Sequence, residues 1–302
     1  MRAEPNSVEE FRRALFEAGI LFPSEIDGIY LRSQTFESIV AGIDRLVSET
    51  GADLGAQTLH FPLVVGRALL ERTDYIRSFP DLSGSISSYT GGEKGYASLL
   101  ESLERGEDWS ESLELTDLGL CSAACHQLYG LLSGALAAPV RFEIFGNCFR
   151  HEPSRDPARM QVFRMHEFVY VGDTEGAQAH RDQWVGRALE LHESIGLKVE
   201  AVIANDPFFG RAGGMLASNQ MADALKIEIV SPICTLEDTA ITSANCHREH
   251  FGEAFSIIDG EGMACHSACV GFGVERIALA LLHTHGMDPQ RWPAFVRERL
   301  ER

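Results

Sequence analysis

The sequence predicts an α+β fold in a single domain, with strands contributed from the whole length of the chain and helices packed beside them. Segments with apolar residues at helical spacing and segments of strand character succeed one another along all 302 residues. No internal repeat, low-complexity tract or clear linker interrupts them. The composition, 45% hydrophobic and 23% charged, is that of a globular protein large enough to bury a substantial core.

The first third of the chain begins with helices. Apolar residues recur every three or four positions over residues 7–20 and 33–50, which predicts two amphipathic helices. Residues 57–66 have strand composition, and Pro62 within them indicates an edge or interface position, because proline donates no ladder hydrogen bond. Residues 80–91 are rich in glycine and serine and are expected to form a flexible loop.

Helices and strands follow in the rest of the chain. The residue patterns predict helices at about 94–104, 122–133 and 176–196, and strands at 140–152, 160–172, 199–204 and 225–232. The strands at 140–152 and 160–172 are expected to pair across the short turn between them. Residues 268–286 have the pattern of a strand that runs into a buried helix ending at Gly286.

Composition also indicates the compartment. The N-terminal 20 residues are amphipathic and acidic and lack the continuous apolar core of a signal peptide. No apolar run approaches the roughly 18–20 residues of a membrane span. Seven cysteines are an odd number in a long chain, which favours reduced thiols over a disulfide framework. We therefore expect a cytoplasmic protein that does not enter the membrane.

The charge balance is acidic, with one local exception. The net charge of -18 works against a large nucleic-acid interface, because binding phosphates over a long footprint needs a basic surface. Residues 150–164, however, hold four arginines against Glu152 and Asp156. Such a hairpin is often only a solvated surface feature. In a chain this acidic, the reversal of charge favours a confined anionic ligand, such as a nucleotide.

Alternation along a strand sorts this hairpin by face. Arg150 and Glu152 share a face at the end of the first strand. On the second strand, one face carries Arg159, Gln161, Phe163, Met165 and Glu167, and the other carries Arg164, His166 and Phe168. The first set offers guanidinium groups for phosphates, an aromatic ring for a base and a carboxylate that can accept a hydrogen bond.

At these residues the sequence resembles a known class. FRHE, followed by a turn and ARMQVFRMHEF, resembles motif 2 of the class II aminoacyl-tRNA synthetases. ACVGFGVERIALAL (268–281) resembles motif 3, and GAQTLHFPLVV, with Pro62, is a weaker match to motif 1, the dimer-interface element. Residues 225–251 are similar to the segment between motifs 2 and 3 of seryl-tRNA synthetases. The resemblance implies an antiparallel sheet flanked by helices, a homodimer, and ATP with Mg²⁺ as ligands.

Roles for individual residues follow from the resemblance. It makes Arg150 the ligand of the ATP α-phosphate and Glu152 the contact to the adenine amine. Arg159 would hold the terminal phosphates, Phe163 would stack on the base, and Arg276 would cover its other face. The main catalytic contributions would come from Arg150 and Arg276.

Two points of this assignment have alternatives. FRMHEF offers Phe168 as a second candidate for the stacking ring and Arg164 as a second phosphate ligand, but the strand faces favour Phe163 and Arg159. Seryl-type enzymes carry a metal-binding Glu where this chain has Thr239. Glu237 or Asp238 would then have to supply the Mg²⁺ ligand.

The cysteines suggest a second metal. Two C-x3-C pairs, Cys121/Cys125 and Cys265/Cys269, have the spacing of a structural Cys₄ zinc site, and inert buried thiols are the alternative. The resemblance offers a third interpretation. A branch of seryl-type synthetases, with archaeal members and short bacterial homologues, binds one catalytic zinc per chain through Cys, Glu and Cys, which correspond here to Cys125, Glu167 and Cys269. Three protein ligands leave a fourth position open for the amino group of an amino acid.

Histidines near these ligands are candidates for supporting roles. His166 and His266 lie next to proposed ligands in the sequence and are expected to contact them. HREH (247–250) has ligand-like spacing, but its histidines are expected in solvent or beside the ligands rather than on the metal.

About 56 residues precede the motif 1 match, too few for the tRNA-binding arm of a seryl-type synthetase, and this segment carries more acidic than basic residues. Residues 1–302 therefore resemble one catalytic domain with a short helical N-terminal segment, residues 1–56. In these features the chain resembles the amino acid:[carrier protein] ligases. These enzymes activate glycine or alanine with ATP and transfer the amino acid to the phosphopantetheine thiol of a small acidic carrier protein. Arg211 and Lys226 are candidate docking cations, and no tRNA is expected to bind. An aminoacyl-tRNA ligase and a non-catalytic paralogue that senses an amino acid or nucleotide are the alternatives.

Overall fold

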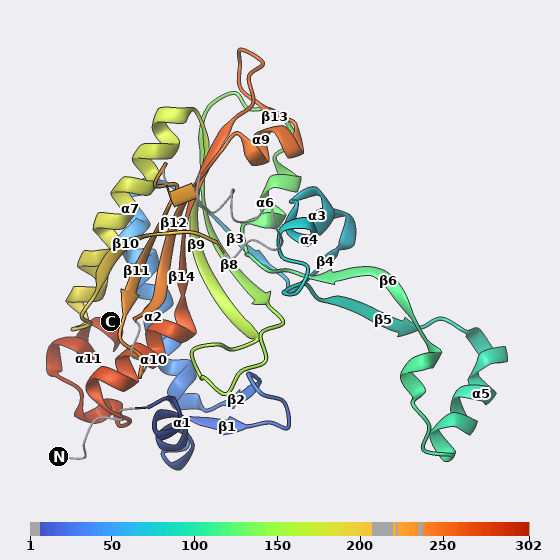
Figure 1. The fold of residues 1–302 in the computed structure, drawn as a ribbon. Coiled ribbons are helices and arrows are strands. Elements are labelled where there is room, and N and C mark those ends of the chain that lie inside the picture. Colours follow the sequence, from blue (N-terminus) through green and yellow to red (C-terminus); the bar gives the residue numbers. More distant parts are fainter. Residues whose placement is uncertain (1–6, 207–219, 222, 235–237, 302) are drawn as a thin grey trace.

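A computed structural model describes residues 7–206, 220–221, 223–234 and 238–301 of the protein. Its centre is a seven-stranded sheet with helices on both faces (Figure 1). In spatial order the strands are β10 (Glu200–Ala204), β11 (Lys226–Ser231), β12 (Thr239–Arg248), β14 (His266–Gly273), β9 (Val162–Gly172), β8 (Val140–Phe149) and β3 (Gln57–Phe61). All neighbours are antiparallel except β3 and β8, which pair in parallel at one edge. The predicted fold class is confirmed.

Long helices cover one face of the sheet. They are α1 (Val8–Glu17), α2 (Gln34–Gly51), α7 (Thr174–Ser194), α10 (Val274–His285) and α11 (Ala294–Glu301). Their apolar side chains share one core with Phe168, Val270 and Phe272 of the sheet. Packing is close enough that a Cβ on Gly51, at the end of α2, would lie 2.3 Å from the Phe168 ring. A glycine is therefore required at this position.

Short helices cover part of the opposite face. They are α3 (Arg67–Arg72), α4 (Tyr75–Ser78), α6 (His126–Leu131) and α9 (His250–Phe255). A second core joins them to the sheet, and it includes Leu128, Tyr129, Ile144, Val169 and Phe251. The two cores lie on opposite sides of β9 and β14 because successive residues of a strand point to opposite faces.

An arm projects away from this body (Figure 1). It consists of β5 (Ser85–Tyr89), β6 (Leu113–Leu120), α5 (Gly92–Glu104) and η2 (Trp109–Ser112), with β4 (Val64–Gly66) at its base. No residue of α5 is buried. The loop predicted at 80–91 is therefore wrong, because Ser85–Tyr89 within it form a strand that pairs with β6.

Smaller elements complete the described part of the chain. They are the ribbons β1 (Leu21–Pro23) with β2 (Tyr30–Arg32) and β7 (Gly134–Ala135) with β13 (Ile257–Ile258), and the turns η1 (Ala52–Leu54) and η3 (Pro289–Arg291). Among the described helices, none has the length and apolar character needed to cross a bilayer.

Two predicted elements differ in extent. The helix expected at 122–133 is limited to α6, because residues 121–125 form a turn before it. The strand expected at 57–66 ends at Phe61, and Pro62 lies between β3 and β4. Since β3 pairs only with β8, the edge position that Pro62 indicated is confirmed.

Candidate active site

A cavity of about 680 Å³ opens on the sheet face that carries the short helices. Its walls come from β9, β11, β12, β14, α9, the start of α10, the α3–α4 and α6 segments, and the residues that follow β8. The volume lies within the range usual for small-molecule sites. The cavity brings together the eight residues to which the resemblance assigned ATP or zinc as a first choice: Cys125, Arg150, Glu152, Arg159, Phe163, Glu167, Cys269 and Arg276.

Strand alternation places the residues of β9 as expected. Phe163, Met165 and Glu167 line the cavity. Phe168 lies on the opposite face, where its ring packs 4.4 Å from that of Trp184. Phe168 is therefore excluded as the stacking ring of this cavity.

Arg164 also lies on the opposite face. Its guanidinium donates to Glu37 at 2.6 and 3.1 Å and to Glu275 at 2.7 Å. With its charge matched by two carboxylates, Arg164 is excluded as the alternative phosphate ligand. His166 likewise contacts Asp44 and Glu143, each at 3.1 Å, so the expectation that it supports the metal ligands is wrong.

Cations gather at one end of the cavity. The Arg150 guanidinium lies 5.5 Å from the Phe163 ring centre and donates to the Ser122 carbonyl. Arg159 pairs with Glu152 at 3.1 Å. Arg276 donates to the carbonyls of Ala158 and Ala240 at 2.8 and 3.0 Å. Three guanidinium groups thus lie at this end of the cavity, and Glu152 and Asp156 lie 3.1 and 4.0 Å from Arg159.

Burial and the neighbouring Arg150 charge lower the pKa of Arg276. An anionic ligand between the two guanidiniums would relieve this repulsion.

A buried ion network lies directly behind this end of the cavity. Glu275, 2% exposed, accepts hydrogen bonds from the Arg164 backbone N–H, the Arg164 Nε and the Arg32 Nη1 at 2.7–2.8 Å. Arg164 and Glu275 are the sequence neighbours of Phe163 and Arg276. The network therefore fixes the backbone on both sides of the slot between that ring and that guanidinium. No pattern in the sequence indicates this network, because its members, Arg32, Glu37, Arg164 and Glu275, come from four separate elements.

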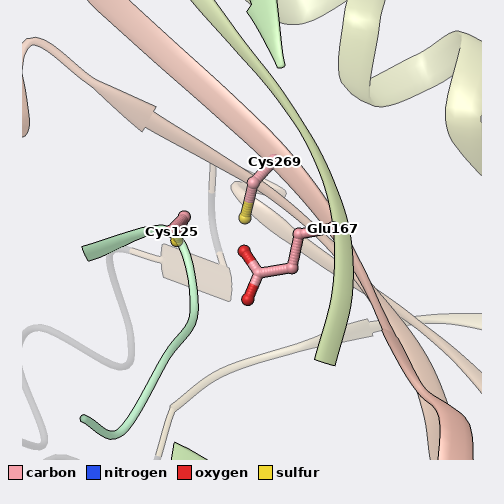
Figure 2. A group of neighbouring side chains, drawn as sticks. All are labelled: Cys125, Glu167 and Cys269. Carbon is pink, nitrogen blue, oxygen red and sulfur yellow. The ribbon is translucent and has the colours of Figure 1, made fainter. Parts of the chain in front are cut away.

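At the other end of the cavity, Cys125, Glu167 and Cys269 point toward one another (Figure 2). Their ligand atoms lie within 4.8 Å of one another, and each residue is 5% exposed or less. Cys125 precedes α6, and Glu167 and Cys269 come from the neighbouring strands β9 and β14, where Glu167 pairs with Gly271. A Cβ on Gly271 would lie 2.5 Å from the Met165 Cε, so the glycine leaves room for the Met165 side chain beside Glu167.

The cluster has the donor atoms of a cation site, and one of its carboxylate oxygens has no hydrogen bond. The Ala124 N–H donates to Glu167 Oε1 at 3.0 Å, whereas the buried Glu167 Oε2 has no hydrogen-bond partner among the described residues. An unpaired carboxylate oxygen in a buried site is costly unless a donor or a cation meets it. Two cysteine sulfurs and one carboxylate oxygen are ligands that zinc accepts. The residues present fit a zinc ion.

The protonation of the cluster supports the same interpretation. Burial, reinforced by the Cys269 charge, raises the pKa of Glu167 to about 7. The hydrogen bond to Cys269, together with burial, raises the pKa of Cys125 well above its ordinary value. The same hydrogen bond, donated by Cys125, lowers the pKa of Cys269. Negative charge is therefore crowded here, and a cation would favour the deprotonated form of all three.

The Cys₄ alternative is not supported. Among the described residues, the group that could hold a metal contains neither Cys121 nor Cys265. The Cys121 thiol instead donates to the Ala123 carbonyl at 3.0 Å.

His247 and Asn245 approach the cluster from β12. His247 Nε2 lies 3.6 Å and Asn245 Nδ2 3.7 Å from Cys269 Sγ. One histidine of the HREH segment is thus beside a proposed ligand. His266 contacts Glu249 instead, at 3.7 Å.

The sequence also suggested docking cations for a carrier protein and Mg²⁺ ligands. Lys226, 8% exposed, is bound to Asp206 at 2.5 Å and Glu228 at 2.9 Å, so it is not a surface docking cation. Arg211 and Glu237 lie outside the described residues, and Asp238 is exposed.

The chain is similar to two groups of known proteins. It is 40% identical over 277 residues to amino acid–[acyl-carrier-protein] ligase 2 of Bradyrhizobium diazoefficiens, which covers 90% of this chain and 83% of the relative. Ligase 1 of the same organism is 39% identical over 276 residues, 90% of this chain and 84% of that relative. The type-2 serine–tRNA ligase of Methanopyrus kandleri is 25% identical over 85% of this chain and 53% of its own length.

Solved structures show the same fold. The M. kandleri seryl-tRNA synthetase, in complex with A. aeolicus tRNASec, superposes with a TM-score of 0.84 at 22% identity, over 100% of this chain and 61% of that chain. A cytoplasmic serine–tRNA ligase of Naegleria fowleri, in complex with AMP, reaches 0.72 at 13% identity, over 96% of this chain and 59% of that chain. The fold is therefore that of the class II synthetases. No protein-family model matches the chain.

Proposed function

The chain belongs to the amino acid–[acyl-carrier-protein] ligases, and from this membership we propose that it activates glycine or alanine with ATP and transfers it to the phosphopantetheine thiol of a carrier protein. One observation carries the proposal beyond the family name. A cation-rich end and a Cys–Glu–Cys cluster share one cavity, where an amino acid held at the cluster would direct its carboxylate toward a nucleotide held by the arginines.

The first step would join the amino acid to AMP. A carboxylate oxygen attacks the α-phosphorus of ATP, the bond to the β-phosphate oxygen breaks, and pyrophosphate leaves. In the second step the thiolate of the carrier attacks the acyl carbon of the adenylate, which forms a thioester and releases AMP. The protein supplies mainly proximity and charge neutralisation, since ATP provides the leaving groups.

The nucleotide end would divide the work among five residues. Arg150 would neutralise the α-phosphate. Arg159 would break its ion pair with Glu152 and bind the terminal phosphates. The Glu152 carboxylate would then be free to accept a hydrogen bond from the adenine amine. Phe163 and Arg276 would hold the base between them. The three guanidinium groups at this end of the cavity support this assignment, and Mg²⁺ would accompany the ATP.

At the other end, Cys125, Glu167 and Cys269 would hold one zinc ion. When bound there with one position open, zinc supplies a Lewis acid to which the amino group of the substrate can coordinate. Two thiolates and one carboxylate give the site a formal charge of about -1 with zinc, which favours a neutral amine as the fourth ligand.

We extend the proposal to partners and compartment. The thiol donor would be a small acidic carrier, and tRNA would not bind, since the chain carries a net charge of -18. The β3 edge carries the motif 1 resemblance and would form a homodimer interface. The seven free cysteines suit the reducing cytoplasm.

The test is amino-acid-dependent exchange of labelled pyrophosphate into ATP, followed by loading of a carrier. We expect exchange with glycine or alanine, and a thioester on the phosphopantetheinylated carrier but not on the same carrier without the prosthetic group. Absence of exchange with any small amino acid, in the presence of zinc, would overturn the proposal. Charging of bulk tRNA would favour the tRNA ligase, and ATP binding without exchange the non-catalytic paralogue.

A matched pair of cysteine variants tests the metal in the same assay. Cys125→Ala should lose bound zinc and exchange activity, whereas Cys121→Ala, four residues away in the same turn before α6 and also buried, should keep both. Equal zinc loss in the two variants would contradict the Cys–Glu–Cys site. Zinc content is measured by elemental analysis of the purified protein.

A further inference from the structure

His247 is held in one orientation beside Cys269 by contacts on both ring nitrogens. Nε2 faces Cys269 Sγ at 3.6 Å. Nδ1 lies 3.1 Å from Ser267 Oγ and 3.4 Å from the Tyr129 hydroxyl. Ser267 is 1% exposed and Tyr129 is fully buried, so neither hydroxyl can exchange its partner freely with solvent. The ring is further packed edge-on against Phe251, with centroids 4.9 Å apart.

A metal-binding Cys269 thiolate can only accept, so the contact at Nε2 favours the neutral imidazole that carries its proton on Nε2. In that tautomer Nδ1 accepts a hydrogen bond, which the hydroxyl of Ser267 or of Tyr129 can donate. Cys269 then receives hydrogen bonds from His247 and from Asn245 Nδ2, at 3.7 Å. Among the described residues, Cys125 interacts with the other two members of the cluster, and no comparable side-chain donor reaches its sulfur.

The backbone is shaped to deliver this contact. The register between β12 and β14 slips by one residue between Cys246 and Arg248, so His247 is the extra residue of a β-bulge. Arg248, the next residue, has a φ of 54°, a left-handed conformation that costs a residue with a side chain on the order of 1 kcal/mol. Bulges beside active sites re-aim side chains, and strain of this kind persists where the surrounding structure enforces it.

We propose that His247 is a positioning residue for the metal site: its Nε2–H, fixed by Ser267 and Tyr129, donates to the Cys269 thiolate and strengthens the hold of the cluster on zinc. The inference rests on the proposed zinc centre. A donor on the sulfur withdraws charge from the thiolate and fixes its direction, which matters most in a cluster with three negative ligands. Outer hydrogen-bond partners of metal ligands typically change metal affinity by about 10–100-fold.

The experiment compares zinc affinity, measured by competition with a chromophoric chelator, in the full-length protein. The wild type should bind one zinc per chain. His247→Phe should bind about 10–100-fold more weakly. His247→Gln, which keeps an N–H donor at the Nε2 end, should recover most of the loss. His250→Phe, in the same segment but on α9 against Phe251, should match the wild type.

Cobalt(II) substitution adds a signature that a merely structural role would not move. Removal of a hydrogen bond raises the energy of the sulfur lone pairs, so the thiolate-to-cobalt charge-transfer band should shift to longer wavelength in His247→Phe and return in His247→Gln. Ser267→Ala should weaken metal binding in the wild-type background and have no further effect in the His247→Phe background, because it acts only through the imidazole.

The outcomes separate this inference from the proposed function. A wild type that binds no zinc overturns the zinc centre itself. A wild type that binds zinc, together with a His247→Phe variant of equal affinity and unchanged charge-transfer band, overturns the role of His247 alone. Additive effects of Ser267→Ala and His247→Phe would also overturn it, since the hydroxyl would then act by another route.

Discussion

The arginines of the β8–β9 hairpin have different roles, and strand alternation decides whether an arginine on a strand faces the cavity or the opposite side of the sheet. Arg150 and Arg159 face the cavity. Arg155 lies at the surface, paired with Glu9 at 3.1 Å. Arg164 points to the other side of the sheet, into the ion network with Glu37 and Glu275. The cations in the cavity are available to a ligand, whereas Arg164 is committed to the fold.

This division predicts that two arginine variants fail in different ways. Arg164→Ala would leave the buried Glu275 with fewer donors and should lower the free energy of unfolding by about 3 kcal/mol, as expected on removing one partner of a buried ion pair. Arg150→Ala should reduce pyrophosphate exchange by at least about 100-fold. Its free energy of unfolding should change by less than about 0.5 kcal/mol.

Urea denaturation and the exchange assay on both proteins check the prediction. A stable but inactive Arg164→Ala protein, or an unfolded Arg150→Ala protein, would show that the two arginines have been assigned to the wrong faces.

The sequence alone predicted the positions of those site residues that depend only on strand alternation and on the order of the motifs. Phe163 and Glu167 share a face because they are four positions apart on a strand, and the motif order brings Arg276 to the same cavity. Glu275 and His247 could not be placed this way. The partners of Glu275 come from separate elements, and His247 depends on a bulge that has no recognised sequence signature.

At the scale of elements, predictions succeeded where an element has a buried face. The helix α2 buries Phe36, Ile39, Ile43, Leu46 and Val47, and this stripe is visible in the sequence. The ribbon β5–β6 has no such face. Leu115 and Leu118 of β6 are 57% and 43% exposed, and β5 is mostly serine. Hydrogen bonds rather than apolar burial therefore hold these strands together, including one from the Thr116 hydroxyl to the Ile86 carbonyl. A Gly/Ser-rich strand of this kind cannot be distinguished from a loop by composition.

The longest helix, α7, depends on one residue at its start. Asp173 is the N-cap and accepts the Gly176 N–H at 2.7 Å. That hydrogen bond, with a second from the Tyr170 hydroxyl, lowers the pKa of Asp173. Asp173→Ala should therefore reduce the free energy of unfolding at pH 7 by about 1 kcal/mol, and Asp173→Asn by only a few tenths, since asparagine also caps helices.

The pH dependence of this effect has a definite sign. A lowered folded-state pKa contributes stability that is present above the unfolded value, about 3.9, and is lost as the pH falls through the folded value. The difference between wild type and Asp173→Ala should thus shrink in urea titrations at pH 3 relative to pH 7. A difference that grows on acidification would contradict the role of the ionised cap.

At the scale of the whole molecule, the cavity joins parts of the chain that are far apart in sequence. Its lining runs from Thr73, at the end of α3, to Arg276, at the start of α10. Strands from both halves of the sheet contribute, and the arginines at its centre repel one another in the absence of an anion. A ligand with several phosphates would both relieve this repulsion and connect the two halves.

Binding of a non-hydrolysable ATP analogue with Mg²⁺ should accordingly stabilise the entire described fold rather than a local segment. At a concentration 100 times the dissociation constant, the stabilisation is about 2.7 kcal/mol. For a chain of this size it corresponds to a rise in melting temperature of roughly 5 °C. Arg276→Ala should lose most of this shift, because the variant removes both the base contact and one central charge.

Arg291→Ala is the matched control, since its side chain is 86% exposed and pairs with Asp288 outside the cavity. Calorimetry with and without the analogue measures both shifts, and an equal rise in the two variants would mean that the nucleotide binds away from α10.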